Sequence, residues 1–328
     1  MSSNIAEIRD QVLAEEILLS PDFDVVDFRS FYRALGQKYK SWLGTDFFYA
    51  AKSISYLPNF IPREEHDEPR AMAKACLRGV FDQQRIEIRK AVGENFERLG
   101  SATHVDLIRD FIAPVYDGAW NSLFRIDPAD IPIVEEVGLL ISGDASLAER
   151  VRLDRSLADL VAKYCGERER EEHLMPLFVL YLTGRNLTLG SLAKSLYLIL
   201  EANIGISFSQ IEWPRLPVAS TVAYVDRRCL REVTLSDRTF KTGEFVRCYI
   251  DTDFQSIRQQ SGLGTFGPKN RECLGKTLVI SIWREIVFQA KDITIVCDEV
   301  VSKVENVSSI SYPQGGLVLI RSDSKKGS

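Results

Sequence analysis

An almost unbroken run of apolar side chains at residues 174–201 constrains the fold more than any other feature. Apolar residues fall on nearly every side of the helix that this run predicts, so no face remains for water. Its length would suit a membrane span, but Arg185, Asn186 and Lys194 interrupt it and we see no other anchor. We expect a long helix through the core of a soluble domain.

Composition and charge narrow the class of protein. With 328 residues and 45% hydrophobic content, the chain can bury one substantial core. The net charge of −5 gives no reason to expect a nucleic-acid partner. Residues 1–19 are amphipathic and lack the basic start and apolar centre of a signal peptide, which predicts a cytoplasmic protein without membrane contact. The tail 322–328 is expected to be disordered.

Cys273 is the residue with the clearest chemical meaning. Leu278, Ile282 and Ile286 follow it at helical spacing, so Cys273 should lie at a helix N-terminus. Unpaired N–H groups and the positive helix end favour a thiolate there. Such a thiolate can hold haem iron from one face, and Arg271 could reach a haem propionate. The alternative is a buried free cysteine at a helix start.

The sequence around Cys273 resembles the haem-binding signature of the cytochrome P450 family, Phe-x-x-Gly-x-Arg-x-Cys-x-Gly. Phe266, Arg271, Cys273 and Gly275 match it, whereas Lys269 replaces the first glycine. The resemblance implies a shortened cytochrome P450 fold, mainly α with a small β subdomain, formed by residues 1–321 as a single domain. It also implies haem b as cofactor, with Cys273 as the axial ligand and Phe266, Arg271 and Gly275 around it.

A second match concerns the charged network that supports the cysteine loop in this family. Glu212 and Arg215 match the Glu-x-x-Arg of the family's K helix, and Arg258 is the later arginine that completes the set. A carboxylate held between two guanidinium groups is a rigid, charge-assisted network. Pro214 departs from the pattern, because an interior proline removes a helix hydrogen bond.

Basic residues elsewhere match the family's propionate contacts. By its position before a hairpin with a Gly-containing turn, Arg227 is the expected ligand in the small sheet. Arg70 and Lys74 share one face of a helix that resembles the family's C helix, with Pro69 in its first turn. His66 and Arg70 have the same spacing, so the register can be His66/Arg70 or Arg70/Lys74. Each of these residues could also be a solvated surface charge.

The distal side departs from the oxygen-activating members of the family. Their core helix carries an acid and a threonine that relay protons, but here Asn186 takes the acid position and Leu187 the threonine position, after a retained Gly184. Neither side chain can relay a proton near neutral pH. Thr188 could substitute if the register slips by one. Arg185 and Asn186 are candidate substrate contacts, or they cap a bend at Gly184.

The predicted function is a haem-thiolate oxidoreductase acting on a small organic or carrier-attached substrate in a biosynthetic tailoring pathway. It uses peroxide or rearranges an oxidised substrate, or it remains a monooxygenase in which the substrate or a water relays protons. A ferredoxin-type protein is a possible electron donor. The alternative is a degenerate cytochrome P450-like auxiliary protein that binds a partner enzyme without catalysis, which the departures at Lys269, Pro214, Asn186 and Leu187 favour.

Overall fold

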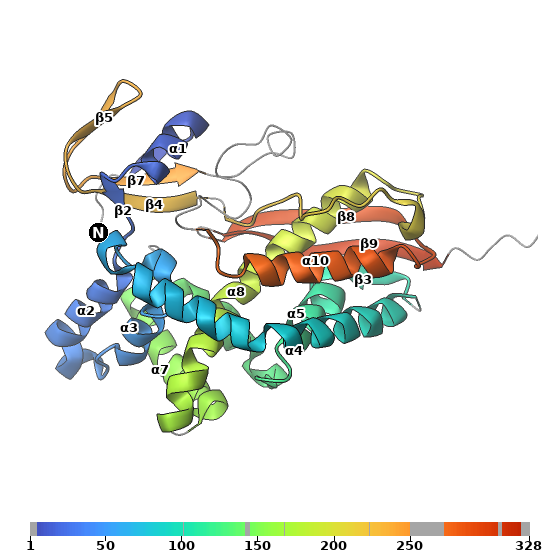
Figure 1. The fold of residues 1–328 in the computed structure, drawn as a ribbon, viewed down its shortest axis with the longest axis horizontal. Coiled ribbons are helices and arrows are strands. Elements are labelled where there is room, and N and C mark those ends of the chain that lie inside the picture. Colours follow the sequence, from blue (N-terminus) through green and yellow to red (C-terminus); the bar gives the residue numbers. More distant parts are fainter. Residues whose placement is uncertain are drawn as a thin grey trace, which may run out of the picture.

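The computed structural model describes residues 5–100, 102–141, 145–166, 168–222, 224–249, 272–307 and 310–322, without the side chains of 81–82, 168–170, 302–317, 319 and 321–322. Within these ranges the chain is mainly helical with small sheets, as the sequence predicts (Figure 1). The helices are α1 (Gln11–Leu19), α2 (Phe28–Leu43), α3 (Phe48–Ile54), α4 (Asp67–Leu99), α5 (Ala113–Ala119), α6 (Ile131–Glu136), α7 (Leu147–Cys165), α8 (Arg168–Glu201) and α10 (Lys276–Ala290). Short turns of helix connect them: η1 (Pro58–Phe60), η2 (Arg63–Glu65), the π-helical η3 (Leu107–Ile112), η4 (Pro128–Asp130), η5 (Val137–Ile141) and η6 (Phe208–Gln210).

Helix α8 crosses the middle of the molecule and contacts α4, α5, α7 and α10 (Figure 1). It corresponds to the apolar run at residues 174–201, extended at its N-terminal end. Val179 and Tyr181 are almost completely buried and, being two residues apart, lie on nearly opposite sides of it. The helix is apolar all round because other helices cover it all round, as the sequence predicted.

Helices α4 and α10 pack against one another beside α8 (Figure 1). Leu278, Ile282 and Ile286 of α10 are all buried, which confirms the helical spacing that the sequence indicated. Helix α5 approaches α4 so closely that a Cβ atom on Gly118 would lie 2.7 Å from the Cβ of Ala91. Glycine is therefore required at that crossing, because a larger side chain would push the two helices apart.

The strands form three small sheets. β1 (Ala6–Ile8), β7 (Phe245–Tyr249), β4 (Tyr224–Cys229) and β2 (Phe23–Asp24) make one sheet in that order, with β1 parallel to β7. The hairpin β5 (Val233–Leu235) and β6 (Arg238–Phe240) turns at Ser236 and Asp237, which both have positive φ. The long pair β8 (Ile295–Val307) and β9 (Ile310–Ser322) carries β3 (His104–Asp106) at its edge.

Buried apolar residues form two clusters. The larger one fills the helical body and extends to the β8–β9 pair, whereas the smaller one joins α1 to the sheet that contains β4. Ile17, Phe23 and Phe240 are central to the smaller cluster and are almost completely buried. In the described part of the chain, no helix combines the length and the apolar character needed to cross a membrane.

Candidate active site

Cys273 lies immediately before α10, where the sequence placed it. The Lys276 N–H donates to the Cys273 carbonyl at 3.3 Å, so the chain turns into the helix at this residue. Burial raises the pKa of the Cys273 thiol, while the backbone N–H groups of Gly275 and Lys276 and the charge of Arg70 act to lower it. Burial thus outweighs the helix end for the free thiol, while the helix end acts in the direction that the sequence predicted; the iron-bound thiolate stays a prediction.

Arg70 of α4 reaches the cysteine segment from the other side. It is only 9% exposed, and its Nη2 donates to the Glu272 carbonyl at 2.8 Å. Its Nη1 is also buried but has no hydrogen-bond partner in the described part of the chain. A buried guanidinium nitrogen without a partner costs free energy, so this geometry suits an anionic group that approaches beside Cys273.

The two registers of the propionate contacts differ clearly in burial. His66 is 6% exposed and directly precedes α4, where its carbonyl accepts a hydrogen bond from the Arg70 N–H at 3.1 Å. Lys74 is exposed, and its charge acts on Glu272. The pKa of Glu272 is lowered chiefly by its hydrogen bond with Lys276, with Arg70 and Lys74 adding to the effect. Burial therefore favours the His66/Arg70 register, with Lys74 near the surface.

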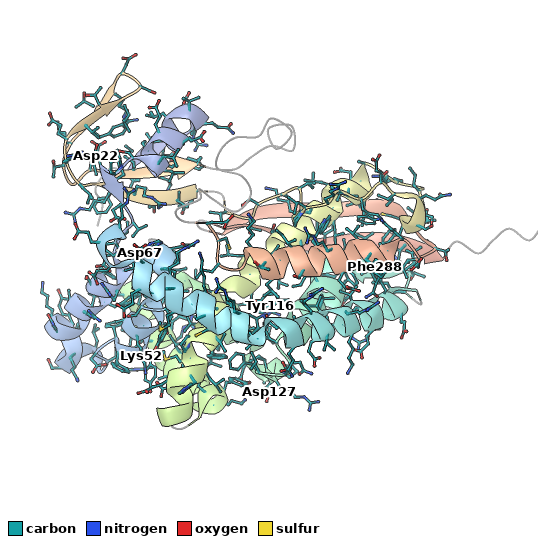
Figure 2. All side chains as sticks on the ribbon, viewed as in Figure 1. Asp22, Lys52, Asp67, Tyr116, Asp127 and Phe288 are labelled. Carbon is teal, nitrogen blue, oxygen red and sulfur yellow. The ribbon has the colours of Figure 1, made fainter. Side chains whose placement is uncertain are left out.

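On α8, Gly184 leaves room for the side chain of Tyr116 from α5. A Cβ atom there would lie 3.1 Å from the hydroxyl of Tyr116, which donates to the Tyr181 carbonyl at 2.9 Å. Tyr116 is buried in the middle of the helical body (Figure 2). Burial is the largest cause of its raised pKa, and the charge of Cys273 contributes to the rise. Tyr116 therefore holds α5 against α8 at Gly184.

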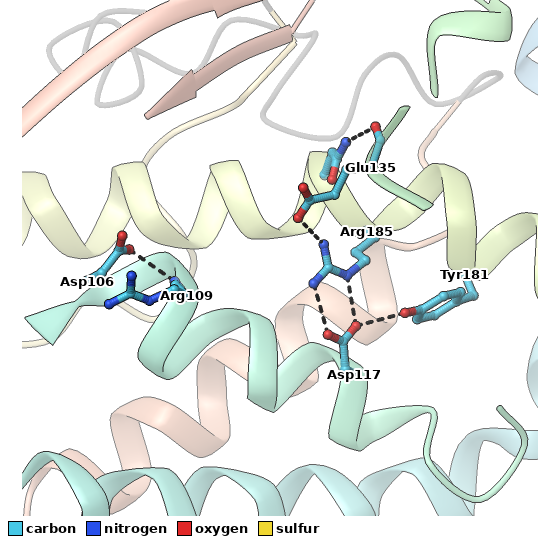
Figure 3. Close-up of polar contacts among 7 residues, drawn as sticks. Asp106, Arg109, Asp117, Glu135, Tyr181 and Arg185 are labelled. Atoms are coloured by element: carbon cyan, nitrogen blue, oxygen red, sulfur yellow. Dashed lines mark hydrogen bonds and ion pairs between the residues drawn. The ribbon is translucent and has the colours of Figure 1, made fainter. Parts of the chain in front are cut away.

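Arg185 is held by two carboxylates from different helices (Figure 3). Its Nε and Nη2 donate to the two oxygens of Asp117 in α5, both at 2.9 Å, and its Nη1 donates to Glu135 of α6 at 2.9 Å. The Tyr181 hydroxyl donates to the same Asp117 at 2.9 Å. Although burial acts to lower it, the pKa of Arg185 is raised by Asp117, Tyr181 and Glu135. This bidentate pair joins α8 to α5 and α6, and a role in holding substrate stays a prediction.

The other predicted distal residues lie in the same stretch of α8. Asn186 donates from Nδ2 to the Glu135 carbonyl at 2.7 Å, while its buried Oδ1 has no partner in the described part of the chain. Thr188 is 5% exposed. The Leu187 carbonyl accepts a hydrogen bond from the Thr221 hydroxyl at 2.8 Å. The structure thus brings Arg185 and Asn186 together at α6, with Thr188 buried further along α8.

A narrow apolar cavity adjoins this stretch of α8. It lies between α3, η5, α7 and α8 and has a volume of only about 10 Å³. Its lining is almost entirely aliphatic: Ala50, Ile54, Leu57, Val137, Leu140, Ile141, Leu157, Val179 and Leu182, with Ser53 and Thr183. The Ser53 hydroxyl is buried and has no partner among the described residues, whereas Thr183 donates to the Val179 carbonyl at 2.7 Å. A small-molecule site encloses roughly 300–1,000 Å³, so this gap is part of the core packing and not a formed substrate site.

The expected charged network behind the cysteine loop differs in the structure. Glu212 and Arg215 lie in irregular chain after η6 and are exposed, not on a helix. Pro214 explains the difference, because it cannot donate a helix hydrogen bond and disfavours helical geometry at Trp213. The Pro214 carbonyl instead accepts from Trp283 Nε1 of α10 at 2.9 Å. Arg258, the third member, lies outside the described residues.

Of the remaining residues predicted to bind haem, two lie within the described part of the chain and two lie outside it. Arg227 lies in β4 opposite Val246, half-buried, and its Nη1 donates to the Asp226 carbonyl at 2.9 Å. Gly275 begins α10 as its N-terminal cap. Phe266 and Arg271 lie outside the described residues.

Several residues of this region have no counterpart in the sequence-based prediction. Tyr116, Asp117 and Glu135 contact α8 from helices far away along the chain, and Ser53 reaches the cavity from α3. A single sequence contains no signal that pairs such distant positions. Only the burial of Arg185 could have pointed to a nearby carboxylate, because buried charges are paired.

The residues present fit a haem group held through Cys273. A cysteine at a helix N-terminus lies next to a buried arginine, and one guanidinium nitrogen of Arg70 has no partner among the described residues. A thiolate ligand for iron and a buried cation for a propionate are the two donors that haem requires here.

The fold and this region define a class of protein: a mainly helical body whose long central helix packs against a second helix that a cysteine precedes. Comparison with solved structures identifies the fold. The chain superimposes on CalO2 with a TM-score of 0.72 and 14% identity, over 98% of this chain and 92% of CalO2. The cytochrome P450 CYP109B1 from Bacillus subtilis gives a TM-score of 0.66 and 12% identity, over 95% and 92% of the two chains.

A third similar structure is that of P450BioI in complex with an acyl carrier protein ligated to hexadec-9Z-enoic acid, with a TM-score of 0.68 and 12% identity over 96% of this chain and 92% of the other. No protein-family model matches the sequence, and no curated protein matches it. The chain therefore has the cytochrome P450 fold, in a shortened and strongly divergent form.

Proposed function

We propose that this protein binds haem b through Cys273 and works as a haem-thiolate oxidoreductase on a small organic or carrier-attached substrate in a biosynthetic tailoring pathway. The single observation that carries the proposal is the pair formed by Cys273 at the start of α10 and the buried, partly unpaired Arg70 beside it. The cytochrome P450 fold supports it, and the carrier-bound neighbour P450BioI supports a carrier-attached substrate.

Haem bound at this position supplies redox chemistry at an iron with a thiolate ligand. Cys273 provides that ligand and Arg70 binds one propionate, with His66 as the adjacent buried group. Arg227, Phe266 and Arg271 complete the predicted ligand set. The exposed Lys74 gives the surface near the cysteine segment one basic group that suits an acidic ferredoxin-type donor, whereas Lys276 is paired with Glu272.

The residues on the distal side limit which reaction the proposed haem enzyme can catalyse. Asn186 and Leu187 provide no acid and no hydroxyl, and the guanidinium of Arg185 is already paired with Asp117 and Glu135. Proton delivery by these side chains is therefore blocked, which favours peroxide-driven chemistry or rearrangement of an oxidised substrate. A monooxygenase reaction requires a proton from the substrate, from a water or from the Thr188 hydroxyl.

The absorption spectrum of the dithionite-reduced protein under carbon monoxide tests the proposal. A thiolate ligand gives a strongly red-shifted Soret band, which the Cys273→Ala variant should lose while keeping its helical circular dichroism. Retention of the band in the variant would remove Cys273 as the ligand.

The second candidate function is an auxiliary protein of the same fold that binds a partner enzyme without catalysis. The exposed, non-helical positions of Glu212 and Arg215 and the paired state of Arg185 favour it. A purified protein that contains no haem and takes up none on addition of hemin would support this candidate over the first.

A further inference from the structure

A surface hollow lies between the C-terminal end of α2 and the outer side of α7, two helices on the outside of the helical body (Figure 1). Its volume is about 630 Å³. Part of its lining is apolar, with Leu43 from α2 and Ala148 and Val151 from α7. The hollow therefore offers apolar surface that can be removed from water by a group that enters it.

Trp42 also lines the hollow and is the most exposed large apolar residue in the described part of the chain. It is 75% exposed, and its ring contacts Tyr39 one turn earlier in α2, with the ring centroids 6.2 Å apart. Exposed tryptophan rings of this kind are frequent anchors of protein–protein contacts, because they bury a large apolar area when a second surface covers them. The same patch thus contains a bulky group and a recess.

The charged groups of the hollow are nearly balanced once their partners are counted. Arg152 is already paired with Glu136, with Nη2 and Oε2 2.5 Å apart. Arg155 donates from Nη2 to the Leu43 carbonyl at 2.8 Å, a neutral acceptor that leaves the positive charge of Arg155 in place. Asp159 is exposed and has no ion-pair partner among the described residues. One positive and one negative charge therefore remain.

This balance decides which kind of partner the hollow suits. A strongly acidic protein, a nucleic acid or an anionic membrane gains little from a patch with one charge of each sign. A second copy of the same patch does gain, because Arg155 and Asp159 are four residues apart and lie on one side of α7. A two-fold axis between them, perpendicular to α7, brings Arg155 of each copy opposite Asp159 of the other.

The shape of the patch meets the same requirement. A two-fold contact buries the same surface on both copies, so that surface has to be complementary to itself. Trp42 beside the hollow fulfils this condition, since the ring of each copy can enter the hollow of the other. Each buried aromatic side chain removes about 150–250 Å² from water, and the two-fold axis doubles every contact.

We infer that the patch between α2 and α7 is a dimer interface, on which a second copy of this chain docks about a two-fold axis. Trp42 of each copy fills the hollow of the other, and two Arg155–Asp159 pairs flank the rings. The inference does not depend on the proposed haem function, because no residue of the lining belongs to the cysteine segment or to α10.

Sedimentation velocity of the full chain over a series of concentrations tests this inference. Trp42→Ala should raise the dimer dissociation constant by about tenfold or more, since buried aromatic anchors dominate such interfaces. Ile86→Ala is the matched control, because Ile86 is an apolar residue of α4 that is 70% exposed and does not line the hollow. Thermal unfolding of each variant verifies that the fold persists.

Charge reversal tests the pairing of the two copies directly. Asp159→Arg leaves only positive charges in the patch and Arg155→Glu only negative ones, so each variant alone should dimerise about tenfold more weakly or worse. An equimolar mixture of the two variants should form a heterodimer, because unlike charges then face one another. High salt should reduce this recovery.

Each result has a defined meaning. A dimer that Trp42→Ala and both charge reversals weaken, that Ile86→Ala leaves unchanged and that the mixture restores supports the inference. An unmodified protein that stays monomeric at every concentration overturns it. Equal dimerisation of Trp42→Ala and Ile86→Ala, or a mixture that associates no better than its separate components, also overturns it.

Discussion

At the scale of single residues, Cys273 and Arg70 show how one side chain sets the role of another. Arg70 holds the carbonyl of the residue before Cys273 and keeps one N–H free of partners among the described residues. Lys74, one turn further along α4, is exposed instead. The two basic residues share one helix face but differ in how strongly they can bind an anion. The buried Arg70 can bind it strongly, whereas water screens the charge of the exposed Lys74.

We predict that Arg70→Gln weakens haem binding by about ten- to a hundredfold, because a charge-assisted hydrogen bond to a propionate contributes about 1.5–3 kcal/mol. Glutamine can still donate to the Glu272 carbonyl, so the cysteine segment should keep its position. Hemin titration followed by the Soret band measures the change. Lys74→Gln serves as the control and should stay within about twofold; equal effects of both substitutions would argue for the Arg70/Lys74 register.

At the scale of elements, carboxylates position the helices around α8. Asp117 of α5 and Glu135 of α6 both hold Arg185 (Figure 3), and Asp154 of α7 accepts hydrogen bonds from the Thr45 hydroxyl at 2.5 Å and the Ala50 N–H at 2.8 Å. The Ala50 contact secures the start of α3. Buried polar links of this kind fix the relative placement of helices that apolar packing alone would leave less specific.

We predict that Asp117→Ala lowers the free energy of unfolding by about 3–5 kcal/mol, because Arg185 would remain buried without its main partner. Glu135→Gln should change it by only about 0–1 kcal/mol, since the Glu135 side chain is 47% exposed. Urea unfolding followed by circular dichroism measures both. A small effect of Asp117→Ala would mean that water or Glu135 can replace the lost carboxylate.

A pH-dependent effect is expected at Asp154. Burial raises the pKa of this carboxyl above its ordinary value of 3.8, so the folded state binds its proton more tightly than the unfolded chain does. Its contribution to stability is then fully present below pH 3.8 and is lost as the pH rises through the higher folded-state pKa.

Asp154→Asn removes the charge and keeps the acceptor contact with the Ala50 N–H through its amide oxygen, while its amide NH₂ takes the place of the oxygen at Thr45 and can donate to that hydroxyl. The stability of the variant relative to the unmodified protein should therefore increase as the pH rises from about 4 to 7. Urea midpoints at several pH values give this difference. A difference that is constant with pH would show that the Asp154 carboxyl does not titrate in this range.

At the scale of the whole molecule, the predicted haem site joins α4, α8 and α10, the helices at the centre of the larger core. The smaller cluster around α1 and β4 is separate from it. A ligand that binds only the folded helical body stabilises that body by mass action.

We predict that excess hemin raises the thermal unfolding midpoint of the protein, by an amount that corresponds to about 2.7 kcal/mol at a hundredfold excess over the dissociation constant. Cys273→Ala should show a clearly smaller rise, because the iron ligand is missing. Scanning calorimetry of both proteins with and without hemin provides the comparison. The same rise in both would indicate non-specific binding of hemin to the apolar surface.

The sequence by itself determined the elements whose signals are local. An apolar run at residues 174–201 specifies a buried helix, and the spacing after Cys273 specifies α10, since helical periodicity depends only on neighbouring residues. The tertiary structure decided what these signals could not: the exposed position of Glu212, the raised pKa of Cys273, and the pairing of Arg185 with Asp117. Burial and ion pairing arise from segments far apart in the chain, so they exist only once the helices have packed.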